Sequence, residues 1–384
     1  NAVANTGDGC AMAYRAGVPM EDMEMIQFHP TTLPSTGVLI SEGVRGEGGI
    51  LYNDEEERFM FEHGYANNDG ELASRDVVSR AELDEVNAGR GIEDEYVDLD
   101  MRHLGEERIL DRLENILHLA EDFEGVDGLD EPMPVKPGQH YAMGGVETDE
   151  NGETCIDGLY AAGETACVSL HGANRLGGNA LPELLVFGAR AGHHAAGKDM
   201  KTAEIQTGPS AKSEDGDVAP PVEPGAIEAG GEGDVAADGA MVEPKETLEH
   251  TVQQEQDRIE TLLEDDGINH AEVRSNVQES MTENVNVFRE ESALEDALRD
   301  LRHARERYED VAVADPSRTY NTDLIHTIET RNILDVAEAI TLGALAREEF
   351  RGAHWRKEFQ ERRDEEWIKH TMLAWNDGTP ELYY

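Results

Sequence analysis

Apolar and polar residues follow two different periods in the first half of the chain. Residues 7–17 have the pattern of a turn and a short helix, which the sequence GDG can cap. The runs GVLISEG (37–43) and GGILYN (48–53) resemble short strands, and they alternate with helical stretches at 75–89 and 105–121. The last stretch carries apolar residues close to the helical period, at Ile109, Leu113, Ile116, Leu117 and Leu119. These patterns predict mixed α/β structure.

Three further patterns predict how these elements are connected. PMPVKPG (132–138) is stiff and punctuated by proline, which predicts a crossing and a hinge between domains. GGVETDENGETCIDGLYAAGE (144–164) predicts a hairpin with an Asn-Gly turn, followed by a buried strand, GLYAAGE. The polar loop HGANRLGGN (171–179) runs into Leu181–Phe187, which we expect to form the buried side of a helix that begins near Leu181.

The pattern changes abruptly near Gly197. Residues 201–246 contain almost no large apolar side chains, so they cannot bury enough surface to offset their ordering entropy. We predict a flexible acidic linker or surface insertion there. Two helical stripes follow and predict a helical bundle. The first is Leu294, Leu298, Leu301 and Tyr308, and the second is Leu324, Ile328, Ile333, Leu334, Ala337 and Leu345.

Charge excludes one class of partner. The 384 residues include 83 acidic and 32 basic ones, for a formal net charge of −51. Nucleic-acid binding by counterion release requires basic patches, so no nucleic-acid partner is expected. The acidity has two explanations, adaptation to concentrated salt and a specific acidic docking face. Acidic residues are spread through every segment, which favours salt adaptation.

The cysteines and the apolar runs limit which metal sites, compartments and membrane segments the sequence predicts. Cys10, Cys155 and Cys167 show no CxxC spacing, so neither an iron–sulfur cluster nor a zinc site is expected, and a reducing compartment is the default. No apolar run approaches the roughly 18 residues of a membrane span, and no signal peptide is recognisable. The chain also lacks an initiator Met, from which we expect it to begin inside a longer one.

Four cationic or polar side chains stand in glycine- and proline-rich surroundings that ordinary cores do not use: His29, Arg75, His140 and Arg175. Each alone has an ordinary explanation, as a loop histidine, a helix-start ion pair, a packed ring or a loop cap. Together they offer donors for at least two carboxylates, and arginine adds a bidentate fork. Glu42 and Arg45 lie three residues apart around Gly43 and could pass a proton toward Arg75. Residue chemistry alone thus indicates an enzyme with an anionic substrate.

Six segments, in order, carry a resemblance to one family: NTGDGCAMAYRAGVPMEDMEMIQFHPT, SEGVRGEGG, SRDVVSRA, HYAMGGV, GLYAAGETACVSLHGANRLGGNALPELLVFG and RGAHWRKEFQERRDEEWIKHT. The chain resembles the flavoprotein subunit of succinate dehydrogenase and fumarate reductase over nearly its whole length, except for residues 201–246. A single short motif matches by chance often, but six in the right order do not.

The resemblance implies roles for the substrate residues. His29 of QFHP, His140 of HYAMGG and Arg175 of GANRLGG would hold the substrate carboxylates. Ser41 stands where the family usually has threonine, and serine keeps the hydroxyl but loses a methyl group. Arg75 of the RDVV motif would be the proton-transfer residue. Glu42 and Arg45 would support it.

The resemblance also implies an FAD site. Asp8 of TGDG and Glu164 of the GE pair would contact FAD, and Glu164 could accept hydrogen bonds from ribose hydroxyls. Ala180 and Leu181 would meet the flavin ring. Ala180 replaces the usual serine, so one hydroxyl donor is lost there, and Pro182 is also unusual. The N-terminus of the following helix would stabilise the electron-rich edge of the ring.

The fold implied by the resemblance is an α/β FAD-binding domain, an inserted α+β capping domain and a C-terminal helical bundle. We expect an N-terminal truncation, because neither a GxGxxG after a strand nor the family's flavin-attaching histidine is present. The implied boundaries are 1–25 and 139–200 for the FAD-binding domain, 26–138 for the capping domain, 201–246 for the linker, 247–350 for the helical domain and 351–384 for a C-terminal segment.

The implied activity is FAD-dependent oxidation of succinate to fumarate. Electrons would pass to an iron–sulfur subunit, and membrane anchor subunits would hold this peripheral subunit at the cytoplasmic face of the cell membrane. Three alternatives remain: fumarate reductase, which runs the same chemistry backwards, then L-aspartate oxidase on the same scaffold, then a truncated, non-catalytic dicarboxylate-binding protein.

Salt adaptation predicts a specific stability curve. The unfolding temperature should rise with potassium chloride well past roughly 1 M, where the Debye length is about 3 Å and simple screening has saturated. Differential scanning calorimetry over a salt series measures it. An unfolding temperature independent of salt would reject salt adaptation.

Overall fold

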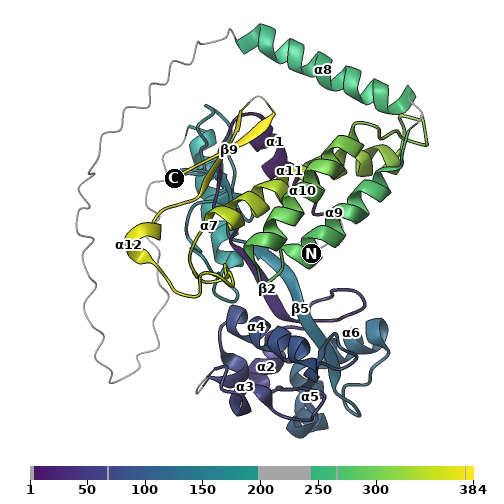
Figure 1. Cartoon of the computed structure of the whole chain (residues 1–384), viewed down its shortest axis with the longest axis vertical. Helices are drawn as coiled ribbons and strands as arrows, with labels where there is room; N and C mark the ends of the chain where they lie inside the picture. Colours follow the sequence, from purple (N-terminus) through teal and green to yellow (C-terminus); the bar gives the residue numbers. More distant parts are fainter. Residues whose placement is uncertain (1–3, 67–68, 198–243, 265–266, 377) are drawn as a thin grey trace.

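The computed structural model describes residues 4–66, 69–197, 244–264, 267–376 and 378–384. Figure 1 shows two lobes, with the strands β2 (Ile26–Thr32) and β5 (Met133–Ala142) running from one to the other. We call residues 33–135 the lower lobe and the other described residues the upper lobe. The two strands pair antiparallel, with Ile26 opposite Ala142 and Thr32 opposite Lys136. This ladder is the connection on which both lobes are built.

In the lower lobe, β4 and β3 extend the ladder into a four-stranded sheet, ordered β2-β5-β4-β3, which short helices cover. Its apolar core includes Leu51, Phe59, Val78 and Leu99, which have no exposed surface. The remaining elements are β3 (Ile50–Tyr52), β4 (Val97–Asp100), α2 (Gly43–Glu47), α3 (Phe59–Glu62), α4 (Arg75–Glu85), α5 (Glu106–Arg112), α6 (Glu114–Glu124) and the short turns η1 (Gly70–Leu72), η2 (Val86–Arg90) and η3 (Arg102–Leu104).

The upper lobe combines a five-stranded sheet with helices. The sheet order is β7-β6-β1-β8-β9, so strands from the two ends of the chain lie side by side. These strands are β1 (Met20–Glu21), β6 (Gly145–Glu147), β7 (Ala166–Cys167), β8 (Met372–Asn376) and β9 (Thr379–Tyr383). The helices are α1 (Asp8–Arg15), α7 (Ala180–Ala195), α8 (Pro244–Glu264), α9 (His270–Asn284), α10 (Glu291–Tyr308), α11 (Thr322–Ala346) and α12 (Asp364–Trp367).

The mixed α/β structure predicted from the sequence is confirmed, and both helical stripes lie on long helices, α10 and α11. The first stripe is buried along α10, where Leu294, Leu298 and Leu301 face the core. The domain boundaries given above stay a prediction. The predicted linker 201–246 lies outside the described residues up to 243, and α8 already begins at Pro244.

The strand prediction for GVLISEG is wrong. This run forms a single bridge, between Leu39 and Thr32, because a turn that includes Gly37 begins it and α2 starts at Gly43. PMPVKPG lies in strand β5 from Met133 onward, and β5 runs from one lobe to the other, so the predicted crossing is confirmed while the hinge stays a prediction. Its prolines are tolerated because β5 pairs with β4 over residues 133–135 and with β2 from Lys136, and Pro137 falls at an irregularity of the second ladder.

Two burial predictions are also wrong. GLYAAGE makes one bridge, from Tyr160 to Glu153, and is partly exposed, because Gly158 and Gly163 take positive φ and turn the backbone at both ends of the run. The helix after the GANRLGG loop is confirmed as α7, but its apolar face is not buried. Leu181 is 68% and Leu185 75% exposed, because no described element covers this face of α7.

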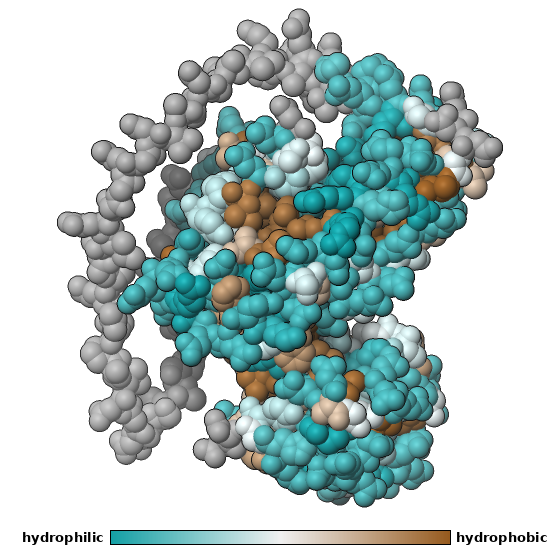
Figure 2. Space-filling model, in the orientation of Figure 1, coloured by the Kyte–Doolittle hydropathy of each residue, from teal (hydrophilic) through white to brown (hydrophobic). Residues whose placement is uncertain are grey.

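The face of the molecule seen in Figure 2 is mostly hydrophilic, with apolar patches on the upper lobe and where the lobes meet. Among the helices that the structure describes, none has the length and apolarity needed to cross a membrane.

A buried arginine joins the C-terminal segment to the start of β2. Arg347 is 1% exposed, and its Nε donates to Glu24 Oε1 at 2.5 Å. Further nitrogens of Arg347 contact Asp22 and Glu349, both at 3.2 Å. Burial raises the pKa of Glu24 and the Arg347 guanidinium opposes that shift, so the ionised form of Glu24 depends on this cation.

Replacing Arg347 by Met should destabilise the protein by about 3–5 kcal/mol, because it leaves the buried Glu24 carboxylate without its counter-charge. Urea unfolding followed by circular dichroism measures the loss. Arg299→Met is the matched control, since Arg299 pairs with Asp296 on the exposed surface and should lower stability far less. Equal losses in both variants would contradict the importance of the buried cluster.

Candidate active site

Charged side chains from both lobes meet beside the β2–β5 ladder. Arg75 is the first residue of α4, and Glu42 directly precedes α2. Arg75 Nε and Nη2 donate to Glu42 Oε2 at 2.9 and 2.7 Å. The remaining Arg75 nitrogen, Nη1, donates to Gln27 Oε1 at 2.9 Å. All three nitrogens of the guanidinium are therefore held in one orientation.

Gln27 ties the two arginines together. Its Nε2 donates to Asn174 Oδ1 and to the carbonyl oxygen of Arg175, both at 2.7 Å. Asn174 Nδ2 in turn donates to Asp76 Oδ1 at 2.8 Å, which anchors the GANRLGG loop to the first turn of α4. The sequence prediction missed Gln27. Its spacing from His29 was the available signal, because alternate residues of a strand share a face.

The same loop needs a glycine where it passes the ion pair. A Cβ at Gly177 would lie 3.0 Å from Glu42 Oε2 and 3.4 Å from Arg75 Nη2. A side chain there would crowd both charged groups, so glycine lets the loop backbone close directly over them.

The predicted histidines lie together, with ring centroids 5.3 Å apart for His29 and His140. The backbone N–H of Thr31 donates to His29 Nδ1 at 3.2 Å, so the proton of the neutral ring is on Nε2. That buried Nε2 has no partner. Arg175 Nη2 donates to His140 Nε2 at 2.9 Å, and Arg175 Nε is likewise buried without a partner. The cluster thus presents unused donors, as an anion site requires.

The electrostatics of the cluster also favour an anion. Burial and the nearby Arg75 lower the pKa of His29 to about 2 and that of His140 to about 4, so both rings are neutral at pH 7. Burial, followed by the charge of Arg75, also lowers the pKa of Arg175. Burial raises the pKa of Glu42, but hydrogen bonding to Arg75 and the positive charges around it shift it down overall. A bound dicarboxylate would relieve this excess of positive charge.

Two of the predicted site residues do not make direct contacts in this cluster. Arg45 is buried in the lower lobe, where its Nη1 donates to the carbonyl oxygen of Glu71 at 2.5 Å. It acts on Glu42 through its charge, with no hydrogen bond between the two side chains. Ser41 is exposed, and its Oγ accepts the N–H of Gly43 at 3.1 Å.

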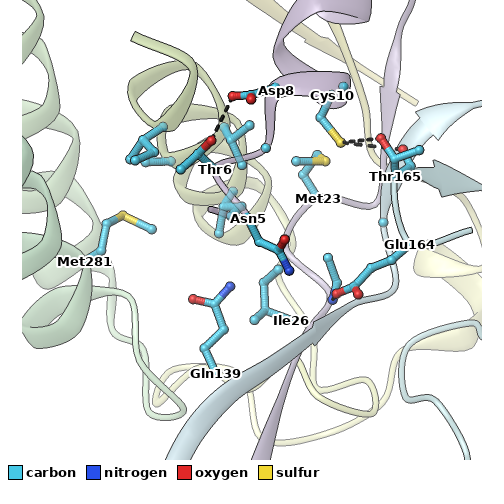
Figure 3. Close-up of a pocket in the computed structure, with 18 of the residues that line it drawn as sticks. Asn5, Thr6, Asp8, Cys10, Met23, Ile26, Gln139, Glu164, Thr165 and Met281 are labelled. Atoms are coloured by element: carbon cyan, nitrogen blue, oxygen red, sulfur yellow. Dashed lines mark hydrogen bonds between the residues drawn. The ribbon is translucent and has the colours of Figure 1, made fainter. Parts of the chain in front are cut away.

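A separate pocket of about 840 Å³ brings together the two carboxylates predicted to contact FAD, Asp8 and Glu164. Its lining comes from α1, from the end of the β2–β5 ladder where Ile26 lies opposite Ala142, and from α9 and α11 (Figure 3). Asp8 accepts hydrogen bonds from Thr6 Oγ1 at 2.8 Å and Asn332 Nδ2 at 2.7 Å. Glu164 accepts the N–H of Ala142 at 3.0 Å, and burial raises its pKa. The size suits a cofactor.

The residues predicted to meet the flavin ring lie elsewhere. Ala180 begins α7 and packs beside Tyr141 and Met143, and Leu181 is exposed to solvent. Neither lines the pocket of Asp8 and Glu164. The residues predicted to contact FAD therefore lie in two separate places in the described structure.

Comparisons with known proteins agree with the sequence motifs. Residues 1–181 match the FAD binding domain family, and residues 274–384 match the family described as fumarate reductase flavoprotein C-term. The fumarate reductase flavoprotein subunit of Haemophilus influenzae is 39% identical over 99% of this chain and 59% of its own length. The succinate dehydrogenase flavoprotein subunit of Coxiella burnetii is 40% identical over 98% of this chain and 60% of its own length.

A solved structure of Escherichia coli quinol fumarate reductase matches this chain with a TM-score of 0.84 and 37% sequence identity. The match covers 100% of this chain and 62% of that chain. This chain belongs to the succinate dehydrogenase and fumarate reductase flavoprotein family. FAD is the cofactor of the domain matched by residues 1–181. The chain spans about 60% of the length of the curated relatives that it matches.

The histidine pKa values can be tested directly. Nitrogen-15 NMR of the imidazole rings should show His29 and His140 neutral from pH 5 to 8, because burial and arginine charges disfavour their protonation. His370 is the internal control, since the hydrogen bonds that it donates to Asp22 and Glu21 raise its pKa to about 10 and keep it protonated over the same range.

The same pKa values determine the direction in which the stability of the folded state changes with pH. Both folded values lie below the roughly 6.5 of an unfolded histidine, so their contribution to stability should be lost as pH falls below about 6.5. Protonation of His29 or His140 near pH 6.5 in the folded protein would contradict the described electrostatics.

Proposed function

We propose that this chain carries the dicarboxylate site of a flavoprotein subunit that oxidises succinate to fumarate. One observation supports it above all others. The Arg75–Glu42 pair, both histidines and Arg175 converge at one place, and two buried donors there have no partner. FAD, when bound, supplies the acceptor for two electrons, and Asp8 and Glu164 are the residues that would hold it.

Substrate binding follows from the unused donors. His29 Nε2–H and Arg175 Nε–H would each donate to a carboxylate of succinate, with His140 beside them. Neutral histidines donate without adding charge, while arginine supplies charge and a forked geometry. Ser41 adds a hydroxyl beside Glu42. A dianion of this size would be stretched between donors from both lobes, which orients its two central carbons.

Proton removal would use Arg75 and Glu42 in sequence. Arg75 passes a proton to the Glu42 carboxylate through the hydrogen bonds that join them, and the neutral guanidine then accepts a proton from a substrate carbon. Arg45 would favour the ionised form of Glu42 through its buried positive charge. Gln27 would keep the Arg75 guanidinium aimed during both transfers.

Fumarate reduction is the second candidate, because relatives at 39% and 40% identity carry both names. It would use the same residues, with the proton moving from Glu42 through Arg75 to the substrate. L-aspartate oxidase and a non-catalytic dicarboxylate-binding protein are further alternatives from the same resemblance.

We also propose the setting of this activity. The lower lobe would act as the capping domain, and the upper lobe would combine the FAD-binding and helical domains. Electrons would pass to a separate iron–sulfur subunit, since the three cysteines of this sequence lack cluster spacing. Membrane anchor subunits would hold the complex at the cytoplasmic face of the membrane. The similarity to a quinol fumarate reductase supports partners of this kind.

The activity is tested with the complete gene product that contains this chain. Arg75→Lys should lower kcat for succinate oxidation by at least about a hundredfold, because lysine cannot reproduce the forked contact with Glu42 and Gln27. KM and flavin absorbance should change little, since other donors hold the substrate. Steady-state kinetics and the visible spectrum measure both.

Arg108→Lys is the matched control, because Arg108 pairs with Glu47 on the exposed surface of the same lobe and should leave kcat unchanged. Near-normal turnover of Arg75→Lys with weakened succinate binding would move the proton-transfer role to another residue. A flavin-containing wild type that neither oxidises succinate nor reduces fumarate would overturn the proposed function.

A further inference from the structure

A group of buried polar atoms in the lower lobe has no partner and no role in the proposed reaction. Glu82 on α4 has no exposed surface, and neither of its carboxylate oxygens accepts a hydrogen bond. Ser79, one turn earlier on α4, is equally buried, and its Oγ is unpaired. On α2, Arg45 is 2% exposed, and its Nε and Nη2 are also without partners. A buried polar group without a hydrogen-bond partner lowers the stability of the folded state, and several such groups in one lobe therefore need an explanation.

The charged groups of Arg45 and Glu82 lie near enough to affect each other's pKa. Burial raises the pKa of Glu82, and the positive charge of Arg45 opposes that shift. In turn, burial lowers the pKa of Arg45, and Glu82 is the carboxylate that most strongly opposes this shift. Among the ion pairs of the described residues, none joins the Arg45 guanidinium to the Glu82 carboxylate within 4.0 Å. The surrounding side chains are apolar, since Val44, Val78 and Ala81 have no exposed surface. A gap between opposite charges in such a place is where a buried water molecule binds.

The charges can be assigned by elimination. The Arg45 guanidinium takes no part in the proposed proton transfer and stays protonated, so Arg45 brings a fixed positive charge into the core. The Glu42 carboxylate is bound to Arg75 by two hydrogen bonds. The Glu71 carboxylate is bound to Arg58 at 2.8 and 2.7 Å and offers Arg45 only its backbone carbonyl. Glu82 is the carboxylate left to balance Arg45.

We propose that Glu82 is an ionised counter-ion of Arg45, joined to it through internal water that also contacts Ser79. Its role rests on the proposed function. By neutralising Arg45, Glu82 limits the positive charge behind Glu42 and so sets how readily Glu42 accepts a proton from Arg75. Glu82 is thus a positioning residue, which touches neither substrate nor cofactor and acts through the charge of Arg45.

The charge state of Glu82 is tested without reference to activity. Infrared difference spectra at pH 7 compare the complete wild-type gene product with Glu82→Gln. An ionised Glu82 predicts the loss of a carboxylate band and no loss in the region of protonated carboxyl groups. Loss of a protonated carboxyl band in Glu82→Gln would overturn the proposal, because Glu82 would then be neutral.

The role of Glu82 is tested by kinetics of the same variant. Glu82→Gln should lower kcat at least about tenfold, because the charge of Arg45 is then no longer neutralised and makes Glu42 a weaker proton acceptor. KM should not rise, because the same positive charge still attracts the substrate dianion. Glu82→Asp, which keeps the charge, should recover part of kcat. An unchanged kcat in folded Glu82→Gln would overturn the role.

Glu85→Gln is the matched control. Glu85 is another buried carboxylate of α4, but it pairs with Arg90 and His63, away from Arg45. The Glu85→Gln variant should be less stable than the wild type but have the same kcat. This result would separate the effect of the Glu82 charge on catalysis from a general effect of disturbed packing in α4. A wild type without succinate or fumarate turnover would reject the proposed function, and the infrared comparison would still decide the charge of Glu82.

Discussion

The antiparallel ladder of β2 and β5 is the constraint on which the rest of the structure depends. It is the element that passes between the lobes, and it carries Gln27, His29 and His140 at their junction. Hydrogen bonds of a sheet hold backbone positions closely, so side chains on this ladder have well-defined places. The arginines that complete the cluster, Arg75 and Arg175, come from opposite lobes and meet through Gln27. The site therefore exists only when the lobes are joined in this way.

Buried arginines recur in this acidic protein, each inside a set of carboxylates or carbonyl oxygens. Arg347 is bound by Glu24, Asp22 and Glu349, and Arg289 donates to the carbonyl oxygen of Glu24. A buried ion pair adds little net stability, but the removal of one partner leaves a charge stranded. Such clusters therefore specify one arrangement of the segments that they join. In the lower lobe the same logic links Arg45 with Glu82, close to the charges that would handle a proton.

The comparisons and the geometry support each other at different levels. The family follows from matches along both ends of the chain and from a fold shared with a solved quinol fumarate reductase. The geometry adds what a family match leaves open, namely which atoms are unpaired. His29 Nε2 and Arg175 Nε await an acceptor, whereas Asp8 and Glu164 face a separate pocket. The apolar face of α7 around Leu185 stays uncovered by the described residues, which sets the predicted flavin-ring contacts apart from that pocket.

Local patterns in the sequence determined the helices α10 and α11, the short helix α1 and the turn at Asn151, because periodicity and turn chemistry act over a few residues. Motifs also marked Arg75, Glu42, His140 and Arg175 as site residues through a family resemblance. Strand pairing was decided only by tertiary structure, because a segment such as Pro134–Gly138 becomes a strand when partners reach both of its edges. Gln27, Gly177 and Glu82 depend on contacts between residues far apart in the chain, and no local pattern encodes which distant atoms will face each other.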